Sequence, residues 1–188
     1  MEPIVYGNFF NGESALGKLE QAKLYSTVNC DIHSETGMIM PQLAMESEST
    51  TPNEAAWEAT DPSGNKYYCS KTTGKIWKRT TSAVYSLIRT NANGAHTGCQ
   101  YFNGYLFYWT ATKLGTYDLA STYNDSFATG TAFRGSCEHA NALYIANGRW
   151  IARVDSANTF SATELVLPAQ YLATCLKSMG DDVLIGTY

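Results

Sequence analysis

The chain has 188 residues, of which 44% are hydrophobic and 16% charged, with a formal net charge of −4. This hydrophobic content excludes a disordered chain, and the length suffices for one domain with a proper core or two small ones. Ser (15) and Thr (21) together outnumber the 30 charged residues, and Tyr alone contributes 13. Such residues favour sheets, so the composition excludes a long helical bundle.

The charge pattern and the N-terminus exclude several kinds of partner. The 13 basic residues are scattered, so the basic patch that drives nucleic-acid binding is missing. No apolar run reaches the roughly 18 residues of a membrane helix. Glu2 stands where a signal peptide carries its positive charges. We therefore expect a soluble chain made in a cytoplasm, with no nucleic acid partner and no membrane insertion.

The stretch 1–27 stands apart from the rest of the chain as an N-terminal segment. Residues 3–9 predict a strand, and residues 11–24 fit one short helix that Gly17 weakens. Residues 44–56 predict a polar, acidic loop or a ragged outer strand.

An internal repeat occupies the remainder of the chain. Cys99, Cys137 and Cys175 are equally spaced and stand in similar settings, and the same step back from Tyr105 reaches Tyr67. Five copies, some partial, fit a period of about 38 residues, and self-similarity at such a period indicates a repeat architecture. The predicted copies cover residues 28–54, 55–92, 93–131, 132–168 and, incompletely, 169–188.

Each copy predicts four short strands joined by tight turns. In the third copy the strands are expected at 94–102, 105–110, 114–119 and 126–131, and in the fourth at 133–140, 143–146, 149–155 and 160–167. Asn103–Gly104 and Asn147–Gly148 supply two-residue turns that tolerate a positive φ. Further turns are expected near 61–65 and 73–74, and the strands are expected to form up-and-down antiparallel meanders. Four strands in about 38 residues, without helices between them, match a propeller blade. The predicted fold is all-β: a β-propeller or partial propeller built from such four-stranded repeats.

The segment Ser70–Trp77 has the spacing of an Asp-box, with Thr72 at the Asp position. In the first copy the corresponding positions hold His33, Glu35, Gly37 and Met40, a further departure. In such a hairpin a polar side chain folds back on the amides of the turn, Gly takes a positive φ, and the aromatic residue packs between blades. This role is structural rather than catalytic.

No pattern of chemistry-bearing residues indicates an enzyme. The five arginines do not recur at one register of the blade, as a sialidase-like carboxylate site would require, and Asp181–Asp182 reads as a turn. The five cysteines and the histidines at 33, 96 and 139 lack zinc-site spacing. Cys99, Cys137 and Cys175 are expected at the same strand position in successive blades, packed near the propeller centre. We predict free thiols, because equivalent positions in neighbouring blades lie too far apart for a disulfide. The sequence predicts no catalytic residue, metal or cofactor.

The aromatic residues are the only feature of the sequence that suggests a binding function. Alternation along a strand sends half of them to each face of a sheet, and most should be core. Those at turns or blade edges are candidates for a protein interface or for stacking on sugar rings. The candidates are Trp77, Tyr101, Tyr105, Tyr108 and Trp109.

Four segments carry a family resemblance. They are Cys30–Gly37, Ser70–Arg79, Asn91–Gly94 and Gly180–Tyr188. They resemble propeller-type proteins encoded by tailed bacteriophages and environmental viruses, over residues 28–188. The resemblance implies a virion component in a tail, neck, fibre or surface appendage, and it implies no catalytic residue.

Three functions remain open at this point. The first is a non-enzymatic virion structural protein that acts through assembly with other virion proteins or with copies of itself. The second is a carbohydrate-binding propeller that recognises a cell surface. The third is a degenerate sialidase-like glycoside hydrolase. We also expect the unpaired edge of the last copy to be covered, by residues 3–9, by further sequence or by another subunit.

Overall fold

The structure is a computed structural model that describes residues 30–31, 40–41, 52 and 54–188. The chain divides into two compact units, Met1–Ser49 and Thr50–Tyr188. In the first unit, β1 (Cys30–Asp31) pairs with β2 (Met40–Pro41) in an antiparallel manner. The strand expected at 3–9 and the helix expected at 11–24 lie outside the described residues, as does most of the first predicted copy.

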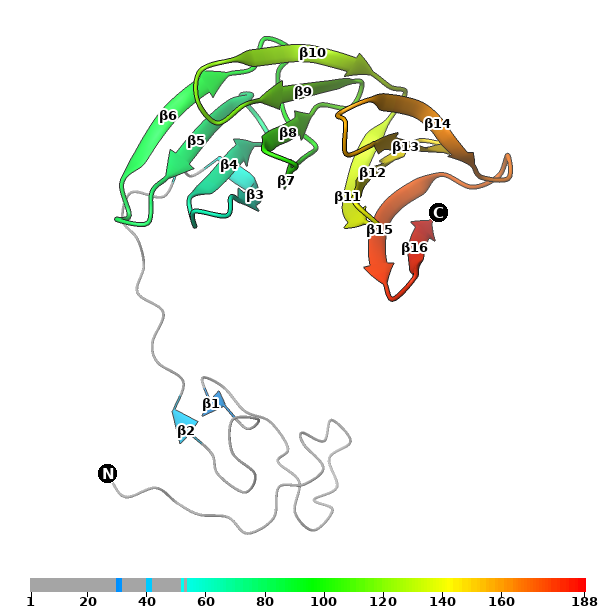
Figure 1. The fold of residues 1–188 in the computed structure, drawn as a ribbon, viewed down its shortest axis with the longest axis horizontal. Helices are drawn as coiled ribbons and strands as arrows, with labels where there is room; N and C mark the ends of the chain where they lie inside the picture. Colours follow the sequence, from blue (N-terminus) through cyan, green and yellow to red (C-terminus); the bar gives the residue numbers. More distant parts are fainter. Residues whose placement is uncertain (1–29, 32–39, 42–51, 53) are drawn as a thin grey trace. The chain divides into compact units, whose positions relative to one another are not determined.

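The second unit consists of four antiparallel sheets, which follow one another along the chain (Figure 1). We call them blades 1 to 4, and they correspond to the second to fifth predicted copies. Blade 1 contains β3 (Ala55–Thr60), β4 (Lys66–Ser70), β5 (Lys75–Arg79) and β6 (Tyr85–Thr90). Blade 2 contains β7 (Gly98–Phe102), β8 (Tyr105–Trp109), β9 (Lys113–Tyr117) and β10 (Tyr123–Thr129). Blade 3 contains β11 (Phe133–His139), β12 (Ala142–Asn147), β13 (Trp150–Val154) and β14 (Phe160–Val166). Blade 4 contains only β15 (Ala173–Met179) and β16 (Asp182–Thr187).

Within each blade the strands pair in chain order, which confirms the predicted up-and-down meanders. The first strand of each blade lies on the inner side of an arc, and β6, β10 and β14 lie on its outer side (Figure 1). β7 contacts both β3 and β11, and β11 contacts β15. The blades therefore stack face against face around the inner strands.

The core lies between the blades rather than inside any one of them. We call the face of a blade toward the next blade in the chain its forward face, and the opposite face its rear face. The forward face of blade 1 and the rear face of blade 2 share one apolar cluster, and two further clusters join blades 2 and 3 and blades 3 and 4. Strand alternation supplies both faces at once: on β8, Trp109 faces blade 3 and Tyr108 faces blade 1.

A polar residue closes the second strand of each complete blade. Ser70 Oγ accepts hydrogen bonds from the amides of Thr72 and Thr73, at 3.0 and 2.9 Å. Thr110 Oγ1 does the same in blade 2, and Asn147 Oδ1 accepts from the amide of Thr131 at 2.7 Å in blade 3. These buried acceptors satisfy amides that strand pairing leaves free.

The structure corrects one detail of the expected Asp-box in blade 1. The side chain that folds back on the turn is Ser70 rather than Thr72, which occupies the Asp position. Gly74 has the expected positive φ of 70°. Trp77 lies half-buried on the rear face of blade 1, in a row with Tyr68 and Leu87, and the preceding predicted copy, which would pack against this face, lies mostly outside the described residues.

The predicted turns are confirmed at three places and shifted at a fourth. Asn103 and Gly104 both have a positive φ, as a two-residue hairpin turn requires. The turns at 61–65 and 73–74 also lie where they were predicted. The Asn147–Gly148 turn is wrong by one residue: Asn147 pairs with Trp150, so the turn is 148–149. The side chain of Asn147 is instead committed to the hydrogen bonds described above.

The cysteines do not share one orientation, which corrects the expectation of a common core position. Cys69, Cys99, Cys137 and Cys175 are free thiols, as predicted. Cys99 packs with the cluster between blades 1 and 2, whereas Cys137 packs toward blade 4 and Cys175 is exposed. Cys99 stands one position further from its turn than Cys137 does, and a shift of one position turns a side chain to the other face of a strand.

We expect Gly115→Ala to destabilise the protein by about 1–3 kcal/mol, the usual cost of overpacking a core. A Cβ at position 115 would overlap with Cε2 of the fully buried Tyr108 ring. Urea unfolding should show a lower midpoint for this variant than for the neighbouring control Thr116→Ala, whose side chain is only half-buried. Equal midpoints would contradict the packing of blade 2 described here.

Candidate functional site

The structure separates the five aromatic residues that the sequence singled out. Tyr108 and Trp109 are buried on opposite faces of β8, with exposed fractions of 0% and 1%. These two side chains are therefore core and offer no surface for a ligand. Tyr101 and Tyr105 are half-buried and pack against different clusters between blades. Trp77 lies on blade 1, apart from the other four.

The rear face of blade 1 is the first candidate surface. A row of side chains crosses its four strands, with Glu58, Tyr68, Trp77 and Leu87 as successive partners. Lys66 binds Glu58 at 2.9 Å. Basic groups lie near its rings, with Lys75 Nζ 6.0 Å from the centroid of Trp77. The corresponding rear-face residues of blades 2 and 3, such as Tyr108 and Ile145, are fully buried.

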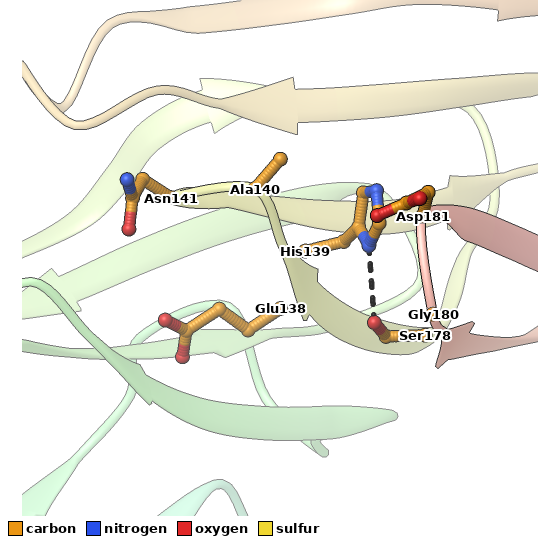
Figure 2. A pocket seen from close by; sticks show the side chains of 7 residues that line it. All are labelled: Glu138, His139, Ala140, Asn141, Ser178, Gly180 and Asp181. Carbon is orange, nitrogen blue, oxygen red and sulfur yellow. Dashed lines mark hydrogen bonds between the residues drawn. The ribbon is translucent and has the colours of Figure 1, made fainter.

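The second candidate is a shallow, open pocket of about 700 Å³ where the first hairpins of blades 3 and 4 meet (Figure 2). It is lined by Glu138, His139, Ala140, Asn141, Ser178, Gly180 and Asp181. His139 Nδ1 and Ser178 Oγ lie 3.0 Å apart and join the two blades. Figure 2 shows the Ser178 side chain directed toward the His139 ring and the Glu138 side chain directed away from it.

A His–Ser contact by itself does not define a nucleophilic site. Acyl transfer also needs a group that orients the histidine and a pair of donors for the developing oxyanion. Among the described residues, no hydrogen bond joins His139 to a carboxylate. Polar side chains on a wide opening of this kind suit hydrogen bonding to a polar surface of a partner.

A third candidate is a more enclosed pocket of about 470 Å³ on the inner side of the arc. It is lined by Trp57, Thr97, Ala111, Ala132, Phe133, Arg134, Gly135, Thr174 and Cys175. Trp57 remains 41% exposed while its Nε1 donates to the carbonyl of His96 at 3.2 Å. The Arg134 guanidinium lies 5.9 Å from the ring centroid of Tyr188. An aromatic face, a cation and two threonines suit a ligand with both apolar and polar parts.

Sequence reasoning missed Trp57 and Arg134 as members of one pocket. The two residues lie far apart in the sequence and come from the inner strands of blades 1 and 3. A signal was present in the repeat, because the first strand of every blade lies on the inner side of the arc. The clustering of aromatic residues along the chain indicated other residues instead.

A partly buried polar network ties blade 1 to blade 2. Asp125 of β10 accepts hydrogen bonds from Arg89, at 2.8 Å from Nε, and from the hydroxyl of Tyr108, at 2.6 Å. Burial acts to raise the pKa of Asp125, but the hydrogen bonds from Arg89 and Tyr108 outweigh it and lower that pKa. Arg89 also lies over the ring of Tyr123 at 4.6 Å. The network spans the two blades and is structural.

His96 belongs to the same junction and is held as a neutral ring. Its Nδ1 lies 3.1 Å from the carbonyl oxygen of Ser70, which only accepts, so Nδ1 carries the proton. Its Nε2 then accepts from Asn91 Nδ2 at 3.3 Å. The residue is 2% exposed, and this burial lowers the pKa of His96.

No metal-binding cluster of three or more His, Cys, Asp or Glu side chains occurs among the residues that the structure describes. In the same part of the chain, no helix is long and apolar enough to cross a membrane.

Comparison with known proteins identifies the fold. No family model and no curated protein matches the sequence. Among solved structures, the computationally designed Ika4 protein aligns with a TM-score of 0.54 at 14% identity, over 76% of this chain and 93% of that chain. The catalytically inactive virginiamycin B lyase from Staphylococcus aureus with quinupristin aligns at 0.58 and 15%, over 80% and 53%. YCF48 bound to D1 peptide aligns at 0.54 and 11%, over 71% and 47%.

These similarities confirm the predicted all-β fold, in which repeated four-stranded antiparallel sheets form the blades of a β-propeller. At such low identities the similarity extends to the fold alone. The chain spans about half the length of the lyase, and a shared propeller fold does not carry its activity.

We expect the protein to lose stability as the pH falls from 7 to 5.5, because the pKa of His96 is lowered by folding. The unfolded chain, with a histidine pKa near 6.5, then binds more protons than the folded chain. The stabilisation is complete above about pH 6.5 and declines below it, by at most about 1.4 kcal/mol per pH unit. The free energy of unfolding from urea titrations at several pH values measures this decline.

The matched control is His96→Gln, which keeps a donor and an acceptor but does not titrate. Its stability should change less over the same interval. The carboxyl of Asp125, whose pKa is lowered, loses its contribution only at more acidic pH, near 4 and below. Equal slopes for the two proteins between pH 7 and 5.5 would contradict the neutral, buried state of His96.

Proposed function

We propose that this chain is a non-enzymatic structural protein that works by assembly, as a component of a viral particle. The observation that carries the proposal is the pair of uncovered faces at the two ends of the described blade array. Every blade face between them is packed against a neighbouring blade. A sheet of this kind is stable when both of its faces are covered.

The end faces carry apolar side chains. Leu87 on the rear face of blade 1 is 54% exposed. On the forward face of blade 4, Met179 and Leu184 are 63% and 49% exposed. Large apolar groups in rows of one sheet mark protein interaction sites. The particle itself is proposed from the resemblance of residues 28–188 to propeller proteins of tailed bacteriophages and environmental viruses.

A second candidate function is binding of carbohydrate at a cell surface. The favouring observation is the inner pocket, where the exposed ring of Trp57 lies with Arg134 and two threonines. Aromatic faces beside hydroxyl and cationic donors suit sugar rings. Tyr108 and Trp109 take no part in this proposed carbohydrate binding, since both are buried.

Crosslinking of the native assembly with an amine-reactive reagent, followed by mass spectrometry, tests the proposal. We expect crosslinks to other chains from Lys66 and Lys177, which lie on the two end faces. Lys113 of β9, inside the array, is the matched control and should crosslink far less to other chains. Intermolecular crosslinks confined to Lys113, or none from the end faces, would contradict assembly through these faces.

Two binding and turnover measurements separate the other readings. A glycan array and a panel of fluorogenic glycosides should both be negative for the purified chain. Binding that is lost in Trp57→Ala but kept in Trp77→Ala would establish the carbohydrate function at the inner pocket instead. Hydrolysis of any glycoside would overturn the non-enzymatic assignment.

A further inference from the structure

We infer that the forward face of blade 4 packs on the rear face of blade 1 in a second copy of this chain. The contact would use the register that already joins neighbouring blades within one copy. The inference rests on the proposed function and deepens it, because it names the partner and the residues that meet.

Two hydrogen bonds between blades define that register. Ser136 Oγ of blade 3 donates to Gln100 Oε1 of blade 2 at 2.6 Å, and His139 of blade 3 meets Ser178 of blade 4 at 3.0 Å. Gln100 lies three positions before its turn at Asn103, and Ser136 four before the turn at Ala140. His139 and Ser178 lie one and two positions before theirs. In both contacts a forward-face residue meets the rear-face residue one position further from the turn.

The counterparts at the two free ends follow from the same pairing. Lys177 lies three positions before the turn at Gly180, as Gln100 does before Asn103, and it is exposed on the forward face of blade 4.

On blade 1 the counterpart of Ser136 is Glu58. Ser136 pairs with Ile145, two positions before Asn147, and Glu58 pairs with Tyr68, two positions before Ser70. The inferred contact therefore places Lys177 opposite Glu58.

The rows that contain these residues match along their length. Lys177 pairs with Leu184, and Glu58 with Tyr68, so an exposed leucine meets a half-buried tyrosine. In the adjacent row Met179 pairs with Asp182, and Thr60 pairs with Lys66. That row places the Asp182 carboxylate opposite the ammonium of Lys66.

The result is an alternating set of four charges across the contact. Glu58 and Lys66 already form an ion pair within blade 1, at 2.9 Å. Lys177 and Asp182 of the second copy would extend it at either end with the opposite sign. Complementary charges of this kind fix the register of an interface and exclude like-charged pairings.

Closure is possible with two copies. The described residues 54–188 of each chain contribute three four-stranded blades and one two-stranded blade, so these parts of two copies provide eight, within the usual range of four to eight for propellers. A two-fold axis would use the same head-to-tail contact twice and leave neither end face free.

Light scattering coupled to size-exclusion chromatography of the full chain tests the inference. We expect a dimer, at twice the 20.6 kDa chain mass. Lys177→Glu and Glu58→Lys should each weaken dimerisation at least tenfold by placing like charges together. The double variant, which restores opposite charges at this pair but places a second lysine beside Lys66, should dimerise at least threefold more tightly than either single variant.

Lys71→Glu is the control, since it makes the same charge change at an exposed position in the β4–β5 turn. It should leave dimerisation unchanged, and circular dichroism should show the same fold for all variants. A monomer at every concentration, larger open oligomers, or single variants that dimerise normally would overturn the inference. If the chain is a monomer but its end faces still crosslink to other proteins of the native assembly, this inference fails while the proposed function stands.

Discussion

The packing of one sheet face on another is the interaction on which this structure depends. A single blade is too thin to hold a core, since its side chains alternate between two faces and each face needs a cover. Trp109 and Tyr108, adjacent on β8, are buried in two different clusters for this reason. Stability therefore resides in the contacts between neighbouring blades, as in other repeat proteins. In those proteins each terminal repeat has one face without a neighbour, and that outer face must be polar for the protein to be soluble.

Polar contacts fix the alignment of these faces. The Arg89–Asp125–Tyr108 network and His96 join blade 1 to blade 2. A single side-chain hydrogen bond joins blade 2 to blade 3, and another joins blade 3 to blade 4. Such fully satisfied groups add register to apolar packing, which by itself is not directional. The two end faces carry the same kinds of groups without a covering blade. This links the fold to the proposed assembly function, because the apolar and polar side chains that join neighbouring blades are also present on the two end faces, where another protein could contact them.

The pockets play a different part. The opening between the first hairpins of blades 3 and 4 is a by-product of two turns that meet at a blade junction, with His139 and Ser178 used to join the blades. The inner pocket is a consequence of placing the first strand of every blade on one side of the arc. Of these two pockets, only the inner one combines an exposed aromatic ring, Trp57, with a cation, Arg134. This combination favours the inner pocket as the site of carbohydrate binding in the second candidate function.

The sequence by itself determined the repeat, the strand-and-turn content and the all-β propeller fold, because turn chemistry and alternation are local properties. Asn103–Gly104, between two strand-forming runs, favours a hairpin through its local backbone preferences alone. The orientation of individual side chains was decided only by the tertiary structure. Cys99 and Cys137 share the spacing of the repeat, yet a difference of one position in distance to the turn sends them to opposite faces. Likewise Trp77 is only half-buried and Trp109 fully buried because of what covers each blade, and that cover comes from residues far away in the chain.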